Sequence, residues 1–478
     1  MSNLMRDGGL GAVGGAAGND ELTTIGLSDL SRCFAEGAFD CVDLVDAYLQ
    51  RSNALNAEIN AYVTIDGDGA MAQAEALDRE RRSGRVRGPL HGVPISLKDN
   101  IDTAGLRTTA GSRVFADRVP ERDATLVRRL RAAGAVILAK AGMHEFALGP
   151  TSASTGFGPV RNPWNTALSA GGSSGGSGAA VAARLCAGSI GTDTGGSVRN
   201  PAAWCGVVGF KPTHGLVSIE GVVPVVRSLD HCGPIARSVA DAALLFKVMS
   251  GQAEPGQTGR DSCPSLDQLH ERVRLLRIGR PIGKPFTGID REIGTCVDLA
   301  LDRIASLVAG VKDVRLPSTS GCSLIVERDA FHARLMRDAA PLYTPDGRAR
   351  LKEATVDRSA FDYIGSLEML RRLRADVAPF DRCDLVVMPT MRVQPPQIAD
   401  LLEAENDGRP TRNADLSNGA AFNYYGGPAI NIPCGMSRAG LPIGLTIAGP
   451  PHSDETVLAL ARVCEAVFGS SGAAAPRG

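Results

Sequence analysis

The chain has 478 residues, 44% of them hydrophobic and 22% charged, and its formal net charge at pH 7 is -1. This composition is typical of a folded globular protein and excludes disorder over most of the chain. The balanced charge gives no electrostatic reason to expect nucleic acid or a membrane surface as a partner.

The lack of a recognisable targeting signal and the pattern of cysteines indicate a reducing compartment. No stretch approaches the roughly 20 consecutive apolar residues of a membrane helix, and the N-terminus lacks the charged region and apolar core of a signal peptide. We therefore expect a cytoplasmic protein. The eleven cysteines form no CxxC pair, and no His/Asp/Glu cluster has metal-ligand spacing, so we expect reduced thiols and no metal.

Elements in the first third of the chain follow from composition and periodicity. Residues 1–21, with the run GGLGAVGGAAGND, are expected to form a disordered tail. From Leu27 to Leu55 apolar residues recur with helical spacing, which predicts two helices separated at Gly37. Residues 123–139 read as one unit, a helix that stops at Gly134 and then a buried strand.

Helices and strands alternate through the rest of the chain. The predicted helices are Ala179–Leu185, Val239–Met249, Cys296–Val308 and a C-terminal helix capped by Ser453 that runs to Val467. The predicted strands are Val273–Ile278, Asp384–Met388, Pro428–Ile432 and Ile443–Ala448. This alternation predicts an α/β fold in which helices cover a sheet.

The chain is expected to form a single domain over residues 22–470, followed by a short disordered tail at 471–478. Residues 315–381 interrupt the alternation, because they are helical, charged and without strands. We interpret this segment as a lid-like helical excursion that covers one side of the sheet.

The run AGGSSGGSG, residues 170–178, allows several interpretations. A phosphate-binding P-loop is excluded, because no lysine follows the last glycine. A dinucleotide fingerprint or the G-x-S-x-G elbow of an α/β-hydrolase needs a strand just before it, and the preceding RNPWNTALSA is turn-like. A plain linker is disfavoured, because the run leads directly into an alanine-rich helix.

Two further stretches add candidate reactive groups. In LHGVPISLKDN, residues 90–100, Lys98 ends an apolar strand-like run. In GTDTGGSVRNP, residues 191–201, Ser197 lies in a second glycine-serine loop, 24 positions after Ser173. Lysine, serine and serine together form a candidate catalytic set.

These stretches resemble the amidase signature family. The block GGSSGGSGAAVAARLCAGSIGTDTGGSVRNPA, residues 171–202, fits the diagnostic pattern of that family along its length, and LKDN lies upstream where the family keeps its lysine. Flanking pieces agree, namely RNPWN at 161–165, CGVVGFKPTHG at 205–215 and LPIGLTIAGP at 441–450. The resemblance implies the fold of that family, a central mixed β-sheet covered by helices on both faces.

The resemblance also implies roles for individual residues. Ser197 would be the nucleophile, Ser173 a bridging serine that follows a cis peptide bond, and Lys98 the base. The backbone N–H groups of the loop would form the oxyanion hole, namely those of Thr194, Gly195, Gly196 and Ser197. Three further residues would support the site, namely Ser174, Asp193 and Arg199.

Elementary chemistry explains these residue types. A serine hydroxyl becomes a useful nucleophile only when a neighbour removes its proton. A lysine can do so only when neutral, and burial lowers its pKa from about 10.4 in water by several units. The apolar residues before Lys98 favour such a shift, whereas Asp99 would oppose it if its carboxylate pointed inward.

The substrate class is predicted from the segment GMHEFALGPTSASTGFGPVRNPWN, residues 142–165. It resembles bacterial hydrolases of arylacetamides such as indoleacetamide and mandelamide, which implies a small aryl or aliphatic primary amide as substrate and no cofactor. The predicted pocket walls are Ala147, Leu148, Gly149, Thr151 and Ser152. A homodimer is allowed but not required. The alternative is the glutaminase component of a tRNA-dependent amidotransferase, its A-type chain, which would hydrolyse glutamine with partner subunits.

Overall fold

The computed structural model describes residues 19–253, 265–320, 322–352, 359–375, 378, 380–409, 411 and 416–469. The helices are α1 (Asn19–Leu22), α2 (Leu27–Ala35), α3 (Cys41–Ile59), α4 (Gly67–Arg82), α5 (Thr125–Ala132), α6 (Gly175–Ala182), α7 (Arg199–Cys205), α8 (Val239–Ser250), α9 (Leu266–Val273), α10 (Arg291–Ala305), α11 (Val326–Ala339), α12 (Pro345–Lys352), α13 (Ala360–Ala375), α14 (Ile398–Asn406), α16 (Ala421–Tyr425) and α17 (Asp454–Phe468). Short 3₁₀ turns are η1 (Arg113–Phe115), η2 (Glu145–Ala147) and η3 (Ala340–Leu342).

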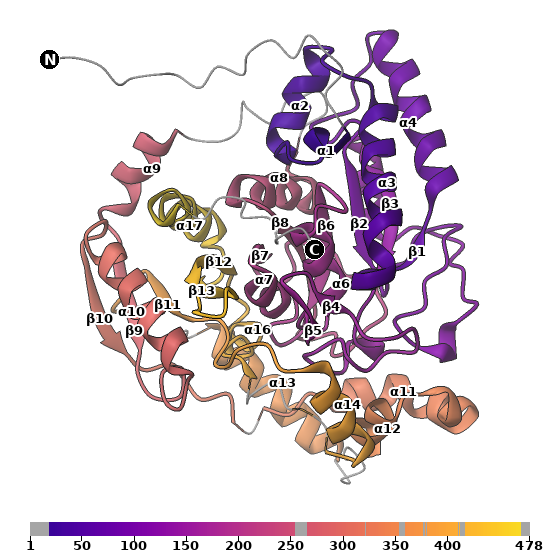
Figure 1. Ribbon diagram of the computed structural model, residues 1–478. Helices are drawn as coiled ribbons and strands as arrows, with labels where there is room; N and C mark the ends of the chain where they lie inside the picture. The colour runs from indigo at the N-terminus through magenta and orange to yellow at the C-terminus, as the bar shows by residue number, and fades with distance from the viewer. Residues whose placement is uncertain are drawn as a thin grey trace, which may run out of the picture.

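Eleven strands form one mixed sheet in the order β1-β3-β2-β6-β8-β7-β12-β13-β11-β9-β10. Its strands are β1 (Tyr62–Ile65), β2 (Pro94–Lys98), β3 (Val136–Ala141), β6 (Gly188–Asp193), β7 (Val208–Lys211), β8 (His231–Ala236), β9 (Arg277–Pro281), β10 (Gly310–Val314), β11 (Leu385–Pro389), β12 (Ala429–Met436) and β13 (Pro442–Ala448). A separate hairpin pairs β4 (Arg161–Asn162) with β5 (Asn165–Ser169). In Figure 1 the sheet runs from β1 on the right to β10 on the left.

The centre of the sheet holds the strands that carry the candidate site. β2 pairs in parallel with both β3 and β6, whereas β6 pairs antiparallel with β8. All residues of β2, β3 and β6 are buried, which explains why their sequences lack the polar alternation of half-exposed strands. Lys98, at the end of β2, is therefore enclosed on every side.

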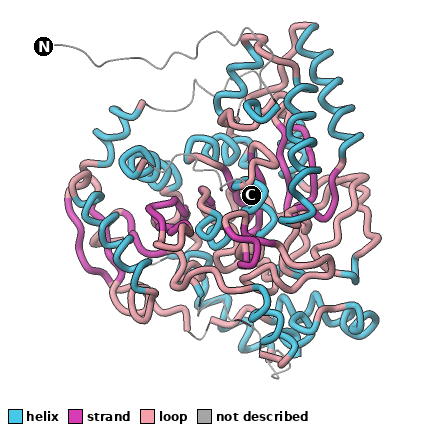
Figure 2. The backbone as a smooth tube through the Cα atoms, in the orientation of Figure 1, coloured by secondary structure: helices cyan, strands magenta, loops and turns pink. Residues whose placement is uncertain are grey.

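Helices cover both faces of this sheet, as the family resemblance implied. A Cβ atom on Gly188 of β6 would meet Leu245 of α8, whereas a Cβ atom on Gly191 would meet Ser174 and Val198, the residues that precede α6 and α7. Because strand residues separated by an odd number point to opposite faces, α8 lies on one face and the starts of α6 and α7 on the other. Figure 2 shows the strands surrounded by helices.

The helical segment between β10 and β11 packs on loops. Tyr343 and Leu351 pack with Ala110, Phe146 and Val223, which lie in loops near the strand ends. In Figure 1, α11, α12 and α13 lie together at the bottom of the view. Near its end the segment also packs on the sheet, because Leu373 and Phe380 lie against the cluster that holds Met388 of β11. Its role as a lid stays a prediction.

Several parts of the chain differ from the sequence-based predictions. Order begins no later than α1, and the remainder of the predicted N-terminal tail and residues 471–478 lie outside the described residues. Residue 273 ends α9, whose Leu269 and Val273 share one buried helix face, so the predicted strand at 273–278 starts instead at residue 277. Strand β5 does precede the glycine-rich run, although in a separate hairpin.

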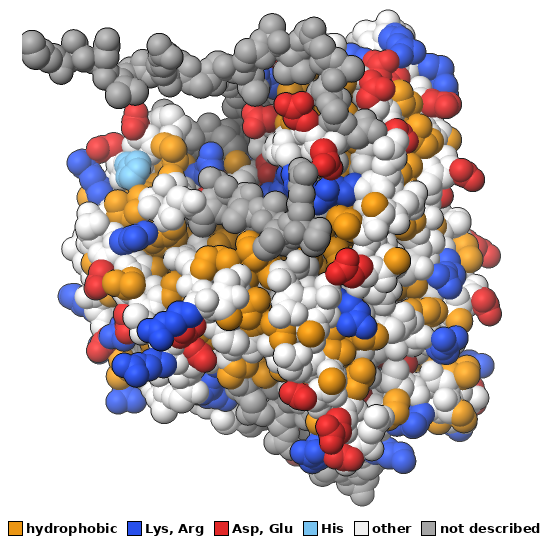
Figure 3. All heavy atoms as spheres, viewed as in Figure 1, with side chains coloured by type: hydrophobic (Ala, Val, Ile, Leu, Met, Phe, Trp, Pro, Cys, Tyr) orange, Lys and Arg blue, Asp and Glu red, His pale blue; other side chains and the backbone are white. Residues whose placement is uncertain are grey.

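The surface charges, the cysteines and the helix lengths can each be described from the structure. On the face shown in Figure 3, Lys and Arg side chains are interspersed with Asp and Glu. The described cysteines are free thiols, and most of them are buried. Within the described residues, each helix is too short or too polar to traverse a lipid bilayer.

Two helix glycines provide a test of this packing. A Cβ atom on Gly176 of α6 would lie 2.3 Å from the carbonyl oxygen of Ala61 and 2.4 Å from the amide nitrogen of Gly142. Because both contacts are to backbone, we expect Gly176→Ala to lower the free energy of unfolding by at least about 3 kcal/mol. Urea unfolding followed by circular dichroism measures this change.

Gly365 of α13 serves as the matched control, because nothing lies within 4 Å of a Cβ atom placed there. Gly365→Ala should raise the free energy of unfolding by about 0.5 kcal/mol, since alanine costs less backbone entropy than glycine in a helix. Equal effects of the two substitutions would contradict the close packing of α6.

Candidate active site

Lys98 lies at the C-terminal end of β2 with its side chain fully buried. Its Nζ donates hydrogen bonds to Ser173 Oγ at 2.8 Å and to Thr192 Oγ1 at 2.7 Å. A third contact joins Nζ to the Thr192 carbonyl oxygen at 3.4 Å. Three oxygen atoms thus surround the amine, and one of them belongs to the predicted bridging serine.

Burial sets the charge of this lysine. Loss of hydration lowers the pKa of Lys98 to about 7, although the carboxylates of Asp193 and Asp230 oppose the shift. Asp99 is not among the groups that oppose the shift. Its carboxylate accepts hydrogen bonds from the backbone N–H of Thr109, at 3.0 Å, and from the Thr109 hydroxyl. A substantial share of Lys98 is therefore neutral at neutral pH.

Ser173 follows a cis peptide bond with Gly172, the geometry that the resemblance implied. The backbone N–H of His144 and the Oγ of Ser152 both donate to the Ser173 carbonyl oxygen, at 3.1 and 3.2 Å. A Cβ atom on Gly172 would lie within 2.8 Å of the backbone of Pro150, Thr151 and Ser152. Glycine at this position lets two chain segments meet around Ser173.

Ser174 joins the bridging serine to the second glycine-serine loop. Its backbone N–H donates to the Ser197 carbonyl oxygen at 3.2 Å, and its Oγ donates to the Thr192 carbonyl oxygen at 3.1 Å. Ser197 is half-buried in the turn between β6 and α7. The structure thus brings Lys98, Ser173 and the Ser197 loop together from segments far apart in the sequence.

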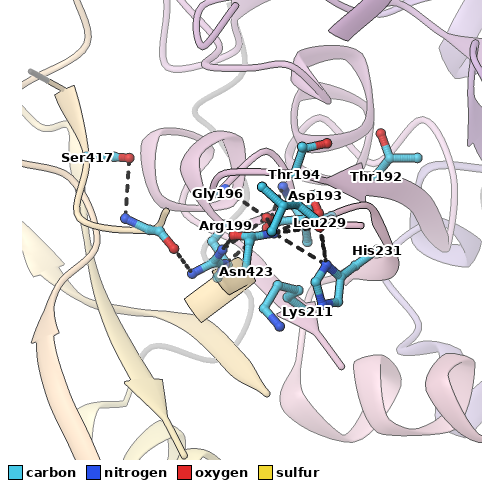
Figure 4. A network of polar contacts seen from close by, with 12 residues as sticks. Thr192, Asp193, Thr194, Gly196, Arg199, Lys211, Leu229, His231, Ser417 and Asn423 are labelled. Atoms are coloured by element: carbon cyan, nitrogen blue, oxygen red, sulfur yellow. Dashed lines mark hydrogen bonds and ion pairs between the residues drawn. The ribbon is translucent and has the colours of Figure 1, made fainter. Parts of the chain in front are cut away.

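Asp193 and Arg199 form a buried ion pair beside this loop (Figure 4). Arg199 Nη2 donates to Asp193 Oδ1, and Nε donates to Oδ2, each at 3.0 Å. Burial alone would raise the pKa of Asp193, but Arg199 outweighs it and holds the carboxyl well below its usual range. Asn423 of α16 completes the network, because its Nδ2 donates to Asp193 Oδ1 at 2.9 Å.

The predicted oxyanion hole needs one correction. Gly196 N–H donates to Asp193 Oδ1 at 2.7 Å, so this amide is already satisfied by a carboxylate and is not a donor to an oxyanion in this conformation. Asp230 fixes the other end of the loop, where Thr194 Oγ1 donates to Asp230 Oδ1 at 2.6 Å. The two carboxylates therefore determine the shape of the loop from both sides.

The predicted pocket residues divide into two groups. Ala147 and Leu148 are half-buried and remain candidates for a pocket wall. Ser152 and Thr151 are buried, and Ser152 Oγ also accepts a hydrogen bond from Gly175 N–H at 3.1 Å. These two residues brace the Ser173 loop, because their side chains are consumed by internal contacts. Gly149 is buried against the ring of His144.

Sequence reasoning missed three contributors to the site. Thr192 precedes Asp193 in the GTDTGGS stretch, so its place beside Lys98 could have been found from that motif. Asn423 and Asp230 lie far from the motifs in sequence. No local pattern marks them, because their roles arise from tertiary contacts.

Comparison with known proteins places this geometry in context. The profile of the Amidase family matches residues 43–458. The A-type chain of the glutamyl-tRNA(Gln) amidotransferase of Roseiflexus sp. (strain RS-1) is 36% identical over 464 residues, which cover 90% of this chain and 94% of that protein.

Two solved structures are similar over nearly the whole chain. One, described as a crystal structure of amidase, has a TM-score of 0.81 and 32% identity and covers 93% of this chain and 100% of its own. The native peptide amidase from Stenotrophomonas maltophilia has a TM-score of 0.79 and 31% identity, with 94% and 98% covered. The narrower resemblance to arylacetamide hydrolases stays a prediction.

The charge state of Lys98 has a consequence for stability. Its folded-state pKa of about 7 lies below the ordinary value of 10.5, so the unfolded chain binds more protons between these values. The cost of burying Lys98 is therefore full below pH 7 and disappears as pH rises toward 10.5. We therefore expect the free energy of unfolding of Lys98→Met, relative to that of the unsubstituted chain, to be highest at low pH.

The measurement is the difference in unfolding free energy between Lys98→Met and the unsubstituted protein at pH 6 and pH 9. Lys140 and Lys211, which are also buried, titrate in both proteins and cancel in this difference. A difference that does not change with pH would contradict the lowered pKa.

Proposed function

This chain belongs to the Amidase family, and we propose that it hydrolyses a small carboxamide to a carboxylate and ammonia through an acyl-enzyme on Ser197. Family membership makes it a C–N hydrolase; the substrate and the residues' roles are our proposal. The observation that supports it most is the 2.8 Å contact between the buried Lys98 Nζ and Ser173 Oγ.

The first half of the reaction starts from neutral Lys98. A neutral amine carries two N–H groups and one lone pair, so Thr192 can accept an N–H while the lone pair accepts the Ser173 hydroxyl proton. Ser173 in turn accepts the proton of Ser197, whose oxygen attacks the amide carbonyl. The tetrahedral oxyanion is stabilised by backbone N–H groups of the loop that contains Ser197.

Collapse of this intermediate returns the proton along the same path to the leaving nitrogen, and ammonia departs. Water then attacks the acyl-enzyme with the same relay as base, and the carboxylate is released. The transfer between Ser173 Oγ and Lys98 Nζ spans 2.8 Å in the structure, so this step of the proposed relay needs no large rearrangement.

A small amide with an apolar acyl group fits the surroundings best. Phe146 is buried and packs edge-on to Phe115, with centroids 5.2 Å apart, and Leu148 packs against the same cluster. The nearby charges are already paired, Arg199 with Asp193 and Arg350 with Asp346. These groups offer apolar contact area and no spare charge, which suits an uncharged substrate.

A second candidate function is the glutaminase reaction of an amidotransferase A-type chain. The observation in its favour is the 36% identity to the Roseiflexus protein, which extends over 94% of that protein. In this case the same relay would act on glutamine, and a partner protein would be required.

Ammonia release by the isolated chain separates these functions. We expect release from arylacetamides or short aliphatic amides, tested beside anilides and glutamine. We expect Ser197→Ala to lose at least about 10³-fold in kcat, because the nucleophile acts as one unit with its base. Ser177→Ala is the control, since Ser177 is a buried serine of the same run whose Oγ has only a long contact, 3.5 Å, to Ile190.

Two results would overturn the proposal. Activity confined to glutamine would support the second function, and activity that survives Ser197→Ala would remove Ser197 from the mechanism. Ser177→Ala should keep the activity of the unsubstituted protein in either case.

The pH dependence of kcat/KM follows from Lys98. Only the neutral lysine can accept the Ser173 proton, and the pKa of Lys98 is about 7. We therefore expect kcat/KM to rise with pH through about 7 and to level off above it. A rate profile measured from pH 5 to 9 tests this, and a value of kcat/KM that still rises tenfold per pH unit at pH 9 would contradict the role of Lys98 as base.

A further inference from the structure

A buried hydrogen bond joins the helical segment to the candidate site. His144 Nε2 and Asp346 Oδ2 lie 2.8 Å apart, and both side chains are almost completely buried. Asp346 is the second residue of α12, whereas His144 directly precedes η2. The two residues are 202 positions apart in the chain, so this contact is purely tertiary.

Burial and charge define which atom donates. Burial lowers the pKa of His144, so the imidazole is neutral, and its Nε2–H donates to the carboxylate. Burial alone would raise the pKa of Asp346, but His144 and Arg350 outweigh it and bring the value to about 2. Arg350 Nε also donates to Asp346 Oδ2, at 2.6 Å. The result is a charge-assisted hydrogen bond away from water.

Glu145 forms a second anchor next to the first. Its Oε1 accepts from Ser112 Oγ at 2.7 Å, and its Oε2 accepts from the backbone N–H and the hydroxyl of Thr344, at 2.9 and 2.7 Å. A Cβ atom on Gly347 would lie 2.2 Å from Glu145 Oε2. The start of α12 is therefore seated directly on residues 144 and 145.

The same histidine contacts the bridging serine. Its backbone N–H donates to the Ser173 carbonyl oxygen at 3.1 Å. Its ring supports Gly149, where a Cβ atom would lie 2.2 Å from the imidazole Cε1. The segment that starts at Gly149 continues to Ser152 and lies against Gly172, so the imidazole supports the backbone on which Ser173 is mounted.

We propose that His144 and Asp346 are positioning residues that hold Ser173 at its distance from Lys98, which makes α12 part of the catalytic unit. This inference rests on the proposed function, because it assigns supporting residues to the proposed proton relay. Loss of the hydrogen bond lets the Gly149–Ser152 backbone shift and moves Ser173 Oγ away from Nζ. Proton transfer slows, while the acyl pocket still binds the amide.

The test uses a sulfonyl fluoride, which needs no knowledge of the natural amide. Ser197 Oγ attacks the sulfur, the S–F bond breaks, fluoride leaves, and the hydroxyl proton passes through Ser173 to Lys98. Mass spectrometry of the intact full-length protein gives the labelling rate, and peptide mapping locates the label. This rate depends on the relay, so a merely structural substitution leaves it unchanged in the folded molecules.

The informative variants are His144→Ala and His144→Gln. We expect His144→Ala to slow labelling about tenfold or more and to lower kcat with little change in KM, because small misplacements of reacting groups cost large factors in rate. A control for packing alone must therefore lie next to the same segment and leave the Asp346 hydrogen bond intact. His144→Gln keeps an N–H donor for Asp346 and should recover most of the rate. Asp346→Asn preserves the shape of the side chain and should slow labelling even if His144→Ala does not fold.

His332→Ala is the matched control. His332 is a buried histidine of α11 that contacts the Tyr343 hydroxyl at 2.8 Å and packs edge-on against Phe146, so its loss empties a similar volume next to residue 145 and leaves the hydrogen bond between His144 and Asp346 in place. We expect comparable losses of thermal stability for His332→Ala and His144→Ala, but slower labelling only for His144→Ala. Equal labelling rates in all folded variants would overturn the positioning role.

The proposed function fails separately from this inference. If the unsubstituted protein is not labelled at Ser197 and hydrolyses no amide, the function itself is wrong. If it is labelled and active, and the His144 and Asp346 variants match it, only the positioning role is wrong.

Discussion

The burial of one amine is the constraint on which the rest of the site depends. The proposed role of Lys98 as a base requires the neutral amine. The pKa of Lys98 falls to about 7 because β2 lies between β3 and β6 with every residue enclosed. An enclosed amine must still find hydrogen-bond partners, and Ser173 and Thr192 supply them. The loops around the sheet end are therefore shaped by the need to bring small hydroxyl groups to a buried nitrogen.

Asp193 shows the opposite solution to burial. This carboxylate stays ionised because Arg199 and Asn423 surround it, and its remaining capacity is used to hold Gly196 N–H and Val198 N–H. A buried amine with a lowered pKa and a buried ionised carboxylate thus lie close to each other. The pair of Asp193 and Arg199 holds the shape of the Ser197 loop through hydrogen bonds. The Coulomb effect of Asp193 on Lys98 limits how far the pKa of that lysine falls.

The features that could be predicted from the sequence are those carried by short, continuous stretches of residues. Ser173 and Ser197 lie in motifs dense in glycine, Lys98 ends an apolar run, and the alternation of buried strands with helices indicates the α/β sheet. Val273 was misassigned, because a β-branched residue beside other apolar residues fits a strand as well as a helix face. Asn423, Asp230 and Asp346 could not be predicted, since each is placed by contacts that no local pattern records.

The candidate site residues and the helical segment differ in the elements that hold them. The relay and its braces sit at strand ends and on the short turns beside them, where the sheet allows little movement. The helical segment contacts this region through polar contacts, among them Asp346 with His144 and Thr344 with Glu145. It also contacts the region through apolar side chains such as Tyr343 and Leu351. Apolar contacts tolerate exchange as long as volume is kept, whereas buried polar anchors do not, because an unpaired partner is costly. If the proposed relay operates, amides of different shape would be accommodated by changes in the apolar part of the segment, while the contacts to His144 and Glu145 hold the start of α12.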